Sequence, residues 1–555
     1  MKALPHWLWA LFAVIFGLKL ALVAGLPVHI VFSPHDDSLY LSRALQLLND
    51  GSFGPYDSKV LTKLPGISIW LAGLRALGLP YLITMNVLYA GAGLYVLLGL
   101  RRCGMHGLVL LAIWALYILN PVSMSQDWVR ILREPLSTIL LVTLFGAALH
   151  MLICIRVRKR HWSHLLVFCG MLAFSMLVRE EDKLLWGLLL LIAAAVFLDA
   201  LAQGDLPRWG LRQIAPLLIV PALAVLGSDF VLRQIVEARY GLPILHDYGE
   251  GEYPKLLAAI RSIDSKTDNR LVMVTQEALA QLRKVAPEFA PVIDVLPPPG
   301  PGTFSCRLQG VCTEWSNGWM PFWIKDAAFS AGLTPNLVAG QQYFKGVREQ
   351  IEEACRSGGI KCTSRGSGVL PPFELRWTRA FVTEFTRLLG MVSNPLPEGL
   401  GGPGTDRNTY PELRRIAQTV TMDISETKMQ LGLKTAAAPV VTDAFVGWRW
   451  ALMTPHMVVA SMVLVLGLLA FFYCWAAPAV HPPSVLLWVL TVFFAYSTAR
   501  LLALTYVATF FGPFDPRIIF STYTAALIFC PVAIAEAVRL RLHAAREGKA
   551  RQMES

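Results

Sequence analysis

The sequence predicts an all-α polytopic membrane protein with about ten transmembrane helices and a mainly α-helical domain inserted on the extracytoplasmic side. Of the 555 residues, 55% are hydrophobic and only 16% are charged, whereas soluble domains carry about 25% charged residues. Apolar runs of about 20 residues recur, and a helix of that length crosses the roughly 30 Å hydrocarbon core of a bilayer. A long polar stretch separates the last three apolar runs from the others.

The apolar runs define the candidate membrane spans. The first run is too long for a signal peptide and lacks a clear small-residue cleavage site, so we interpret it as a retained anchor. The candidate spans are residues 8–32, 81–100, 107–125, 136–155, 165–177, 184–198, 214–230, 457–475, 485–507 and 518–537.

These spans divide the chain into three parts. Residues 1–230 form an N-terminal transmembrane module, whose first outer loop is residues 33–80. Residues 231–447 form an extracytoplasmic soluble domain. Residues 448–555 form a C-terminal transmembrane module with a basic cytoplasmic tail. Inside the soluble domain, helical patterns cover residues 255–263, 276–286, 321–331 and 337–354, a Pro/Gly-rich linker occupies 297–302, and residues 405–434 are polar and weakly patterned.

The basic residues predict the orientation, because cytoplasmic loops are enriched in Lys and Arg. If Lys2 lies in the cytoplasm and the chain crosses ten times, all strongly basic short segments fall on the same side. Both termini are then cytoplasmic, and the net charge of +11 reflects topology better than a nucleic-acid partner. The basic residues concerned are Arg101, Arg102, Arg156, Arg158, Lys159, Arg160, Arg208, Arg212, Arg539, Arg541, Arg546, Lys549 and Arg551.

The cysteines favour the same orientation. Two close pairs, Cys306/Cys312 and Cys355/Cys362, lie in the predicted soluble domain, and disulfides persist outside the cytoplasm. We therefore expect two local disulfides; a zinc site is the weaker alternative, because no histidine accompanies the four cysteines. The remaining five lie in or beside apolar spans, as buried small hydrophobic residues do. The outer face of a bacterial inner membrane is the expected location, ahead of the endoplasmic reticulum.

Two short helices are expected in the first outer loop. Residues 38–49 place apolar side chains on one face, which suits a helix in the plane of the interface, and Asn49-Asp50-Gly51 ends it. Residues 67–77 follow Pro65-Gly66 and carry Trp70, a residue type that anchors helices at the interface.

Charged residues gather on the predicted outer side, where ionisable groups at membrane depth usually serve a function. Carboxylates can transfer protons, and guanidinium groups can bind an anion. Arg500 falls inside a span, whereas the others lie in loops next to spans. The set comprises Asp36, Asp37, Asp127, Arg130, Arg133, Glu134, the segment Arg179-Glu180-Glu181-Asp182-Lys183, Arg500, Asp515 and Arg517.

Each of these residues also has a structural interpretation. Asp36-Asp37 is compatible with a helix N-cap, residues 179–183 with a solvated turn, and Arg133-Glu134 with an internal salt bridge. Arg500 requires either a buried partner or a phosphate. Lys19 in the first span has no assigned role, because a snorkelling lysine or a helix contact explains it. Residues 246–252 fit a plain loop, although they are close enough in sequence to the seventh span to overhang a site.

The first outer loop resembles that of the polyprenol-dependent GT-C glycosyltransferases, the superfamily of the protein O-mannosyltransferases and the lipid A aminoarabinose transferases. The resemblance rests on the uncleaved first span, the acidic pair after it, the interfacial helix, and Lys63-Leu64-Pro65-Gly66 before Trp70. The superfamily has a Lys-Pro-Pro-like segment there, so this chain departs from it. Asp127-Trp128-Val129-Arg130, Arg133-Glu134-Pro135 and Asp515-Pro516-Arg517 also resemble the superfamily; residues 231–447 do not.

The resemblance implies a GT-C-like fold and a membrane glycosyltransferase whose donor is a sugar on a polyprenyl phosphate. Asp36 or Asp37 in the catalytic loop, residues 33–80, would be the general base, and adjacent like charges would raise at least one of their pKa values. Asp127 and Glu134 are further candidate catalytic residues. The candidate substrate-binding residues are Tyr40, Lys63, Arg130, Arg133, Arg179, Lys183, Arg500 and Arg517.

Other features of the reaction stay open. No cofactor is required by the resemblance, and a divalent metal ion on Asp36, Asp37 and Asp127 is the alternative that some members of the superfamily use. The acceptor is a lipid, a glycan or a protein, and membrane lipids surround the chain. A transporter or flippase for a lipid-linked or anionic substrate is the competing function, although no inverted repeat is visible. A non-catalytic assembly factor is a third.

Overall fold

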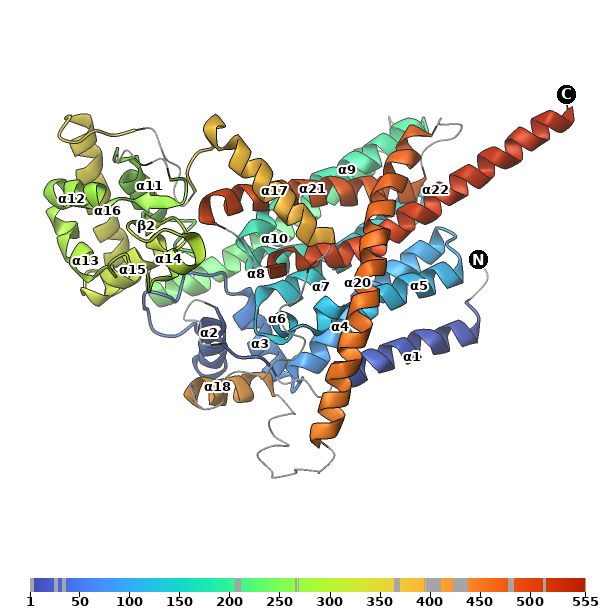
Figure 1. Ribbon diagram of the computed structural model, residues 1–555, viewed down its shortest axis with the longest axis horizontal. Helices are drawn as coiled ribbons and strands as arrows, with labels where there is room; N and C mark the ends of the chain where they lie inside the picture. Colours follow the sequence, from blue (N-terminus) through green and yellow to red (C-terminus); the bar gives the residue numbers. More distant parts are fainter. Residues whose placement is uncertain are drawn as a thin grey trace.

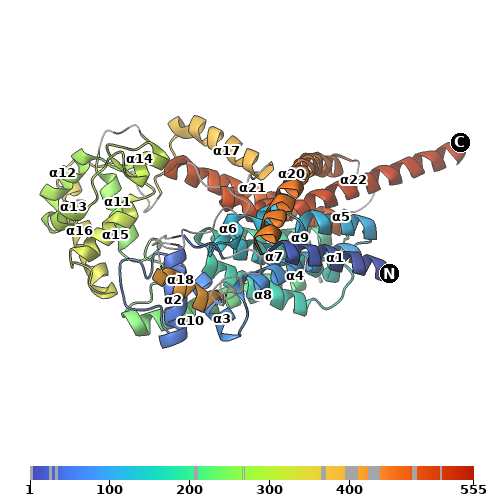
Figure 2. The same ribbon diagram turned by 60° about the horizontal axis from the view of Figure 1, so that its bottom comes forward.

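In the computed structural model, a bundle of long helices carries a smaller helical domain at one end (Figure 1). Both chain termini lie at the opposite end of the bundle (Figures 1 and 2). The structure describes residues 4–23, 28–31, 36–204, 211–264, 267, 269–363, 370–393, 395, 411–422, 438–477, 484–512 and 516–554. Lys2, Arg208, Asp515 and much of the polar stretch 405–434 therefore lie outside the described residues.

Eight of the described helices are long and apolar enough to cross a membrane. Two further predicted spans correspond to shorter apolar helices, α5 (Gly107–Ile118) with 12 residues and α8 (Trp162–Val178) with 17. The polytopic all-α class is thus supported, whereas ten full crossings are not established. The eight are α1 (His6–Val23), α4 (Tyr81–Arg102), α7 (Arg133–Arg156), α9 (Leu185–Ala202), α10 (Leu211–Tyr240), α20 (Ala438–Ala476), α21 (Val485–Phe511) and α22 (Phe520–Glu554).

Helix α7 forms the centre of the bundle and packs against α4, α8, α21 and α22. Its side chains are buried on all sides, as expected of a helix that is apolar all round. Small residues let the helices approach closely. A Cβ atom at Gly467 of α20, for example, would lie 2.3 Å from the Cβ of Cys530 in α22. The buried amine of Lys19 in α1 donates to Ser123 Oγ and to the Ser123 carbonyl, 2.9 Å away, so it makes a helix contact and does not snorkel.

The first loop contains the two predicted short helices, α2 (Asp37–Asp50) and α3 (Gly66–Ala76). Gly51, with φ 64°, ends α2 as expected. The loop is held between the bundle and the inserted domain, because α10 continues ten residues beyond the predicted span and Tyr240 Oη donates to the Gly54 carbonyl at 2.8 Å.

The inserted domain has its own hydrophobic core. The four predicted helical segments correspond to α11 (Tyr253–Ser262), α12 (Gln276–Val285), α15 (Met320–Ser330) and α16 (Leu337–Arg356). The short helices α13 (Ala290–Val295) and α14 (Phe304–Gln309) were not expected, nor was the antiparallel sheet of β1 (Val272–Val274) and β2 (Trp315–Ser316).

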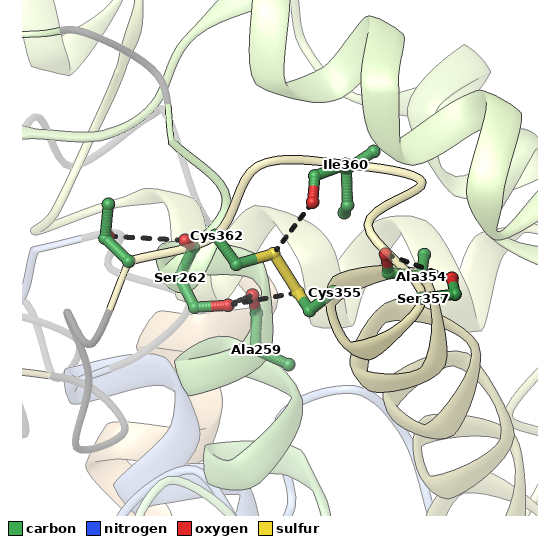
Figure 3. Close-up of a disulfide and its surroundings, with 8 residues drawn as sticks. Ala259, Ser262, Ala354, Cys355, Ser357, Ile360 and Cys362 are labelled. Carbon is green, nitrogen blue, oxygen red and sulfur yellow. Dashed lines mark hydrogen bonds between the residues drawn. A yellow bond between two sulfur atoms is a disulfide. The ribbon is translucent and has the colours of Figure 1, made fainter.

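Both predicted disulfides are present, Cys306–Cys312 and Cys355–Cys362. The second joins the end of α16 to the strand-like segment that pairs with the end of α11, where Thr363 N donates to the Ser262 carbonyl at 2.7 Å (Figure 3). The other five cysteines are free and mostly buried.

Two further helices fall within the predicted soluble domain but pack against other parts of the chain. Helix α17 (Thr378–Ser393) lies along α21, and α18 (Pro411–Thr421) lies on α2 and α3. Hence part of the segment 231–447 covers the bundle and the first loop.

Candidate functional site

A polar cavity of about 310 Å³ opens between the first loop, the start of α7, the end of α8 and the second half of α21. Four of its lining side chains are cations and two are carboxylates, and all six were singled out from the sequence. They are Asp36, Lys63, Arg133, Glu134, Arg179 and Arg517. Leu132, Leu504, Val507 and Ile518 complete the lining. Two larger hollows, of about 440 Å³ between α5, α20 and α22 and of about 680 Å³ between α5 and α22, are lined mainly by apolar side chains, so the smaller cavity has the chemistry of a site.

The two adjacent aspartates have different roles. Asp37 is fully buried, and Arg130 binds its carboxylate in bidentate fashion. Arg130 Nε donates to Oδ1 at 3.0 Å and to Oδ2 at 2.9 Å, and Arg130 Nη2 donates to Oδ2 at 2.5 Å. Burial raises the pKa of Asp37 to about 7, Arg130 opposes the shift, and the charge of Asp36 adds to it. Arg130 does not line the cavity, so its guanidinium stabilises the start of α2 and is not displayed to a ligand.

Asp36 faces the cavity. It occupies the N-cap position of α2, but its side chain makes no capping hydrogen bond, so the capping interpretation is wrong for the side chain. Among the described residues, nothing donates a hydrogen bond to its carboxylate or pairs with it within 4 Å. Burial alone would raise the pKa of Asp36, but the surrounding cations, first Lys63 and Arg133, outweigh burial and hold the pKa below its ordinary value. Asp36 is therefore an ionised carboxylate that faces the cavity.

Two Arg-Glu dipeptides pair with each other across the cavity wall. Arg133 at the start of α7 bonds to Glu180, and Glu134 lies 3.7 Å from Arg179, which follows α8. Burial alone would raise the pKa of Glu180, but Arg133, then Lys63 and His246, hold it well below its usual range. The expected salt bridge within Arg133-Glu134 is wrong, because the partners come from the other dipeptide. The solvated-turn interpretation is wrong for Arg179, which is 2% exposed.

Lys63 is held in place by a residue that the sequence did not reveal. The buried guanidinium of Arg43 in α2 donates to the carbonyls of Lys63 at 3.0 Å and Lys59 at 3.1 Å, and to that of Val60. The only signal in the sequence was an arginine inside an amphipathic helix.

Gly66, which follows Lys63-Leu64-Pro65, lies in close contact with the end of α8. A Cβ atom at Gly66 would lie 2.4 Å from the Leu177 carbonyl oxygen at the end of α8. This close approach leaves no room for any other residue unless the backbone moves, and it brings the first loop against the segment that carries Arg179.

The segment after α10 also reaches the site. His246 Nε2 lies 3.1 Å from the Thr62 carbonyl oxygen and 3.7 Å from Glu180 Oε1. Next to it, Asp247 N donates to the Leu61 carbonyl at 2.9 Å, and the Asp247 carboxylate forms a buried ion pair with Lys325 of α15. Phe322 of α15 lies under Lys63, 5.8 Å from Nζ to the ring centroid. The segment is a loop, as the plain-loop interpretation has it, and its contacts join the inserted domain to the first loop.

Six of the proposed site residues do not line the cavity: Asp37 and Arg130, which pair with each other, and four more. Asp127 lies in the short helix α6 (Gln126–Val129), and Lys183 lies in η2 (Glu180–Leu184). Tyr40 is fully buried nearby, and its hydroxyl has no hydrogen-bond partner among the described residues. Arg500 is 1% exposed, and its three guanidinium nitrogens likewise have none. It lies one turn from the cavity-lining Leu504, on the same helical face of α21.

The described residues contain no group of three or more His, Cys, Asp or Glu side chains arranged to share a metal ion. Asp36, Asp37 and Asp127 are accordingly not such a group, and both oxygens of Asp37 are engaged by Arg130.

No protein-family model, curated protein or solved structure matches this chain.

Proposed function

We propose that this chain is an integral membrane glycosyltransferase of GT-C type, which moves a sugar from a polyprenyl phosphate to an acceptor hydroxyl. The observation that supports the proposal is the cavity, in which four cations line the wall together with Asp36, a carboxylate that forms no ion pair within 4 Å among the described residues. That combination suits a reaction with one proton to remove and one phosphate to release.

Asp36 is the base in this proposal. The acceptor oxygen forms a bond to the anomeric carbon, its proton passes to the Asp36 carboxylate, and the bond from the anomeric carbon to the phosphate oxygen breaks with its electron pair. Geometry selects Asp36 over Asp37, because a base must reach its proton before its pKa matters. Asp37 has the pKa closer to neutrality, about 7, but both of its oxygens accept hydrogen bonds from Arg130.

The cations stabilise the leaving phosphate. Lys63 and Arg517 come from opposite walls of the cavity, the first loop and the turn η6 (Pro516–Ile519). Arg133 and Arg179 each hold a carboxylate already, so they supply both fixed positive charge and rigidity. Such preorganised charge stabilises a developing anion more than mobile water does.

The inserted domain faces the extracytoplasmic side in this proposal, as the distribution of basic residues and the disulfides favour. The polyprenyl tail lies among the membrane-spanning helices, and the sugar and phosphate enter the cavity. The acceptor is a lipid, a glycan or a protein hydroxyl that approaches from the side of the inserted domain. A bacterial inner membrane provides this arrangement.

The test is replacement of Asp36 by Asn in the full chain, with sugar transfer measured in membranes supplied with a polyprenyl-phosphate sugar. We expect a loss of about 10²- to 10⁴-fold, the usual contribution of a general base. Asp294→Asn is the matched control, because Asp294 forms a surface pair with Arg283 on the inserted domain, and it should leave transfer unchanged. Normal transfer by the Asp36→Asn variant would end the assignment.

Arg500 favours a second candidate, a transporter or flippase for an anionic or lipid-linked substrate. A buried guanidinium with no hydrogen-bond partner among the described residues, inside a membrane-spanning helix, is also expected along an anion pathway. Movement of a labelled lipid-linked substrate across proteoliposomes without a covalent product would support this candidate and contradict the first.

A further inference from the structure

Helix α17 exposes an uncharged stripe of side chains along most of its length, although its other side is already packed against the protein. Beyond Arg379 its exposed residues are Val382, Thr383, Thr386, Leu389 and Gly390, none of them charged. Val382 is 55% exposed and Leu389 is 47% exposed. A surface helix in water places charged residues on its exposed face and apolar residues on its buried face, so the surroundings of this stripe are unlike water.

The charged residues of the second half of α17 lie toward the protein. Glu384 is buried, and it pairs with Arg387 at 2.7 Å. Glu384 is one turn before Leu388, which is fully buried against Leu501 and Leu504 of α21. An ion pair turned inward beside an apolar stripe turned outward is the arrangement of helices that contact hydrocarbon.

The exposed hydroxyl groups are also satisfied within the helix. Thr383 Oγ1 donates to the Arg379 carbonyl at 2.9 Å, and Thr386 Oγ1 donates to the Val382 carbonyl at 2.8 Å. These bonds pair both hydroxyl donors of the stripe, which is a requirement for polar groups in contact with lipid.

The position of α17 continues the membrane-spanning part of the bundle. The helix starts near the end of α21, where Tyr506 Oη donates to the Pro371 carbonyl at 2.5 Å, and it descends beside α21 (Figures 1 and 2). At its far end, Ser461 Oγ of the membrane-spanning α20 donates to the Ser393 carbonyl at 2.8 Å. The helix is preceded by Arg376 and Trp377, and the Arg376 Cζ atom lies 4.6 Å from the centroid of the Trp377 ring. Both residue types anchor chains at the interface.

We infer that α17 is a re-entrant interfacial helix whose uncharged stripe contacts the acyl chains of the leaflet on the side of the inserted domain. It enters at Trp377 and reaches its greatest depth near Leu389 and Gly390. The helix also packs against η6, which carries Arg517, so it separates this wall of the cavity from the surrounding lipid. The inference does not depend on the proposed reaction.

The experiment measures depth directly. Spin labels are attached to cysteines introduced singly at Val382, Leu389 and, as the aqueous control, Glu353 on α16, which is well exposed; the unsubstituted chain gives the background from its free cysteines. In proteoliposomes, we expect oxygen to collide with the label at Leu389 more often than a nickel chelate does. The label at Glu353 should collide more often with the nickel chelate, and the ratio of the two collision frequencies at Val382 should be intermediate. Nickel-chelate access at both α17 sites equal to that at Glu353 would overturn the inference.

A second measurement uses no spin labels, so that a perturbation by the labels cannot affect it. Leu389→Lys should lower the melting temperature of the protein in proteoliposomes, because a charge would enter the hydrocarbon. Leu308→Lys, at an exposed leucine of the inserted domain, should leave the melting temperature unchanged. Equal behaviour of the two lysine variants would contradict a lipid-facing α17.

Discussion

Arg130 holds both carboxylate oxygens of Asp37, and this leaves the adjacent Asp36 as the acid that faces the cavity. Two neighbouring residues of the same type are thereby divided into a structural acid and a candidate base. The division follows from helix geometry, because side chains at successive positions point in different directions from the helix axis.

Removal of Arg130 should destabilise the protein. Asp37 is fully buried, so Arg130→Ala leaves a buried carboxylate without its partner, and the expected loss is about 3–5 kcal/mol. The double variant Asp37→Asn/Arg130→Ala should recover part of that loss, because the uncompensated charge is gone. Thermal unfolding in detergent measures both; a single variant as stable as the unsubstituted chain would contradict the buried pair.

The crossed Arg-Glu pairs should show energetic coupling across the cavity wall. In a double-mutant cycle, Arg133→Ala and Glu180→Gln should couple by about 0.5–3 kcal/mol, the range for residues in one ion-pair network. Arg133→Ala with Glu134→Gln serves as the comparison, because these neighbours pair with different partners. Stronger coupling between Arg133 and Glu134 would mean that the pairing within the dipeptide holds after all.

Gly66 should tolerate no side chain. Gly66→Ala places a Cβ against the Leu177 carbonyl, and we expect a loss of about 1–3 kcal/mol from overpacking, together with a displaced Lys63. Gly73→Ala in the same helix is the matched control, since nothing lies within 4 Å of its Cβ position, and alanine should favour the helix there by up to about 1 kcal/mol. The free energies of unfolding of the two variants, measured under identical conditions, test this prediction.

His246 should make stability depend on pH. Burial lowers the pKa of His246 below 6.5; Glu180 and Asp247 oppose the shift, and Lys63 and Lys183 add to it. The unfolded chain therefore binds the proton more readily than the folded chain. The contribution of His246 to the free energy of unfolding is fully present above about pH 6.5 and decreases as the pH falls below that value. Between pH 7.5 and 5.5, the melting temperature of His246→Gln should fall less than that of the unsubstituted chain. Parallel curves would show that this histidine titrates as it does in water.

The local patterns of the sequence sufficed for many of the elements, although not for α13, α14, α17, α18 or the small sheet. The helices α2 and α3 and the two disulfides follow from apolar spacing, a terminating glycine and the separation of the cysteines, all of which act over a few residues. Length and apolarity likewise reveal the spans, although α5 and α8 are too short to settle whether each crosses. The acid and cation types that line the cavity were also visible, because charge beside an apolar run is rare.

The sequence did not reveal which charged residues pair with each other or which carbonyl groups an arginine binds. Arg133 and Glu134 are adjacent, yet each pairs with the other dipeptide, and Arg43 binds carbonyls about twenty residues further along the chain. The exposed uncharged stripe of α17 could be recognised only from the structure, in which the opposite side of the helix packs on α21 through Leu388.

The sequence by itself determined that this chain is a helical membrane protein with acids and arginines near the ends of its spans. Only the tertiary structure decided that Asp36 faces the cavity, that Arg130 occupies Asp37, and that His246 and Gly66 contact segments that carry cavity residues. The physical reason is that hydrophobicity acts on each segment separately, whereas ion pairs and close contacts depend on how segments far apart in the chain pack together.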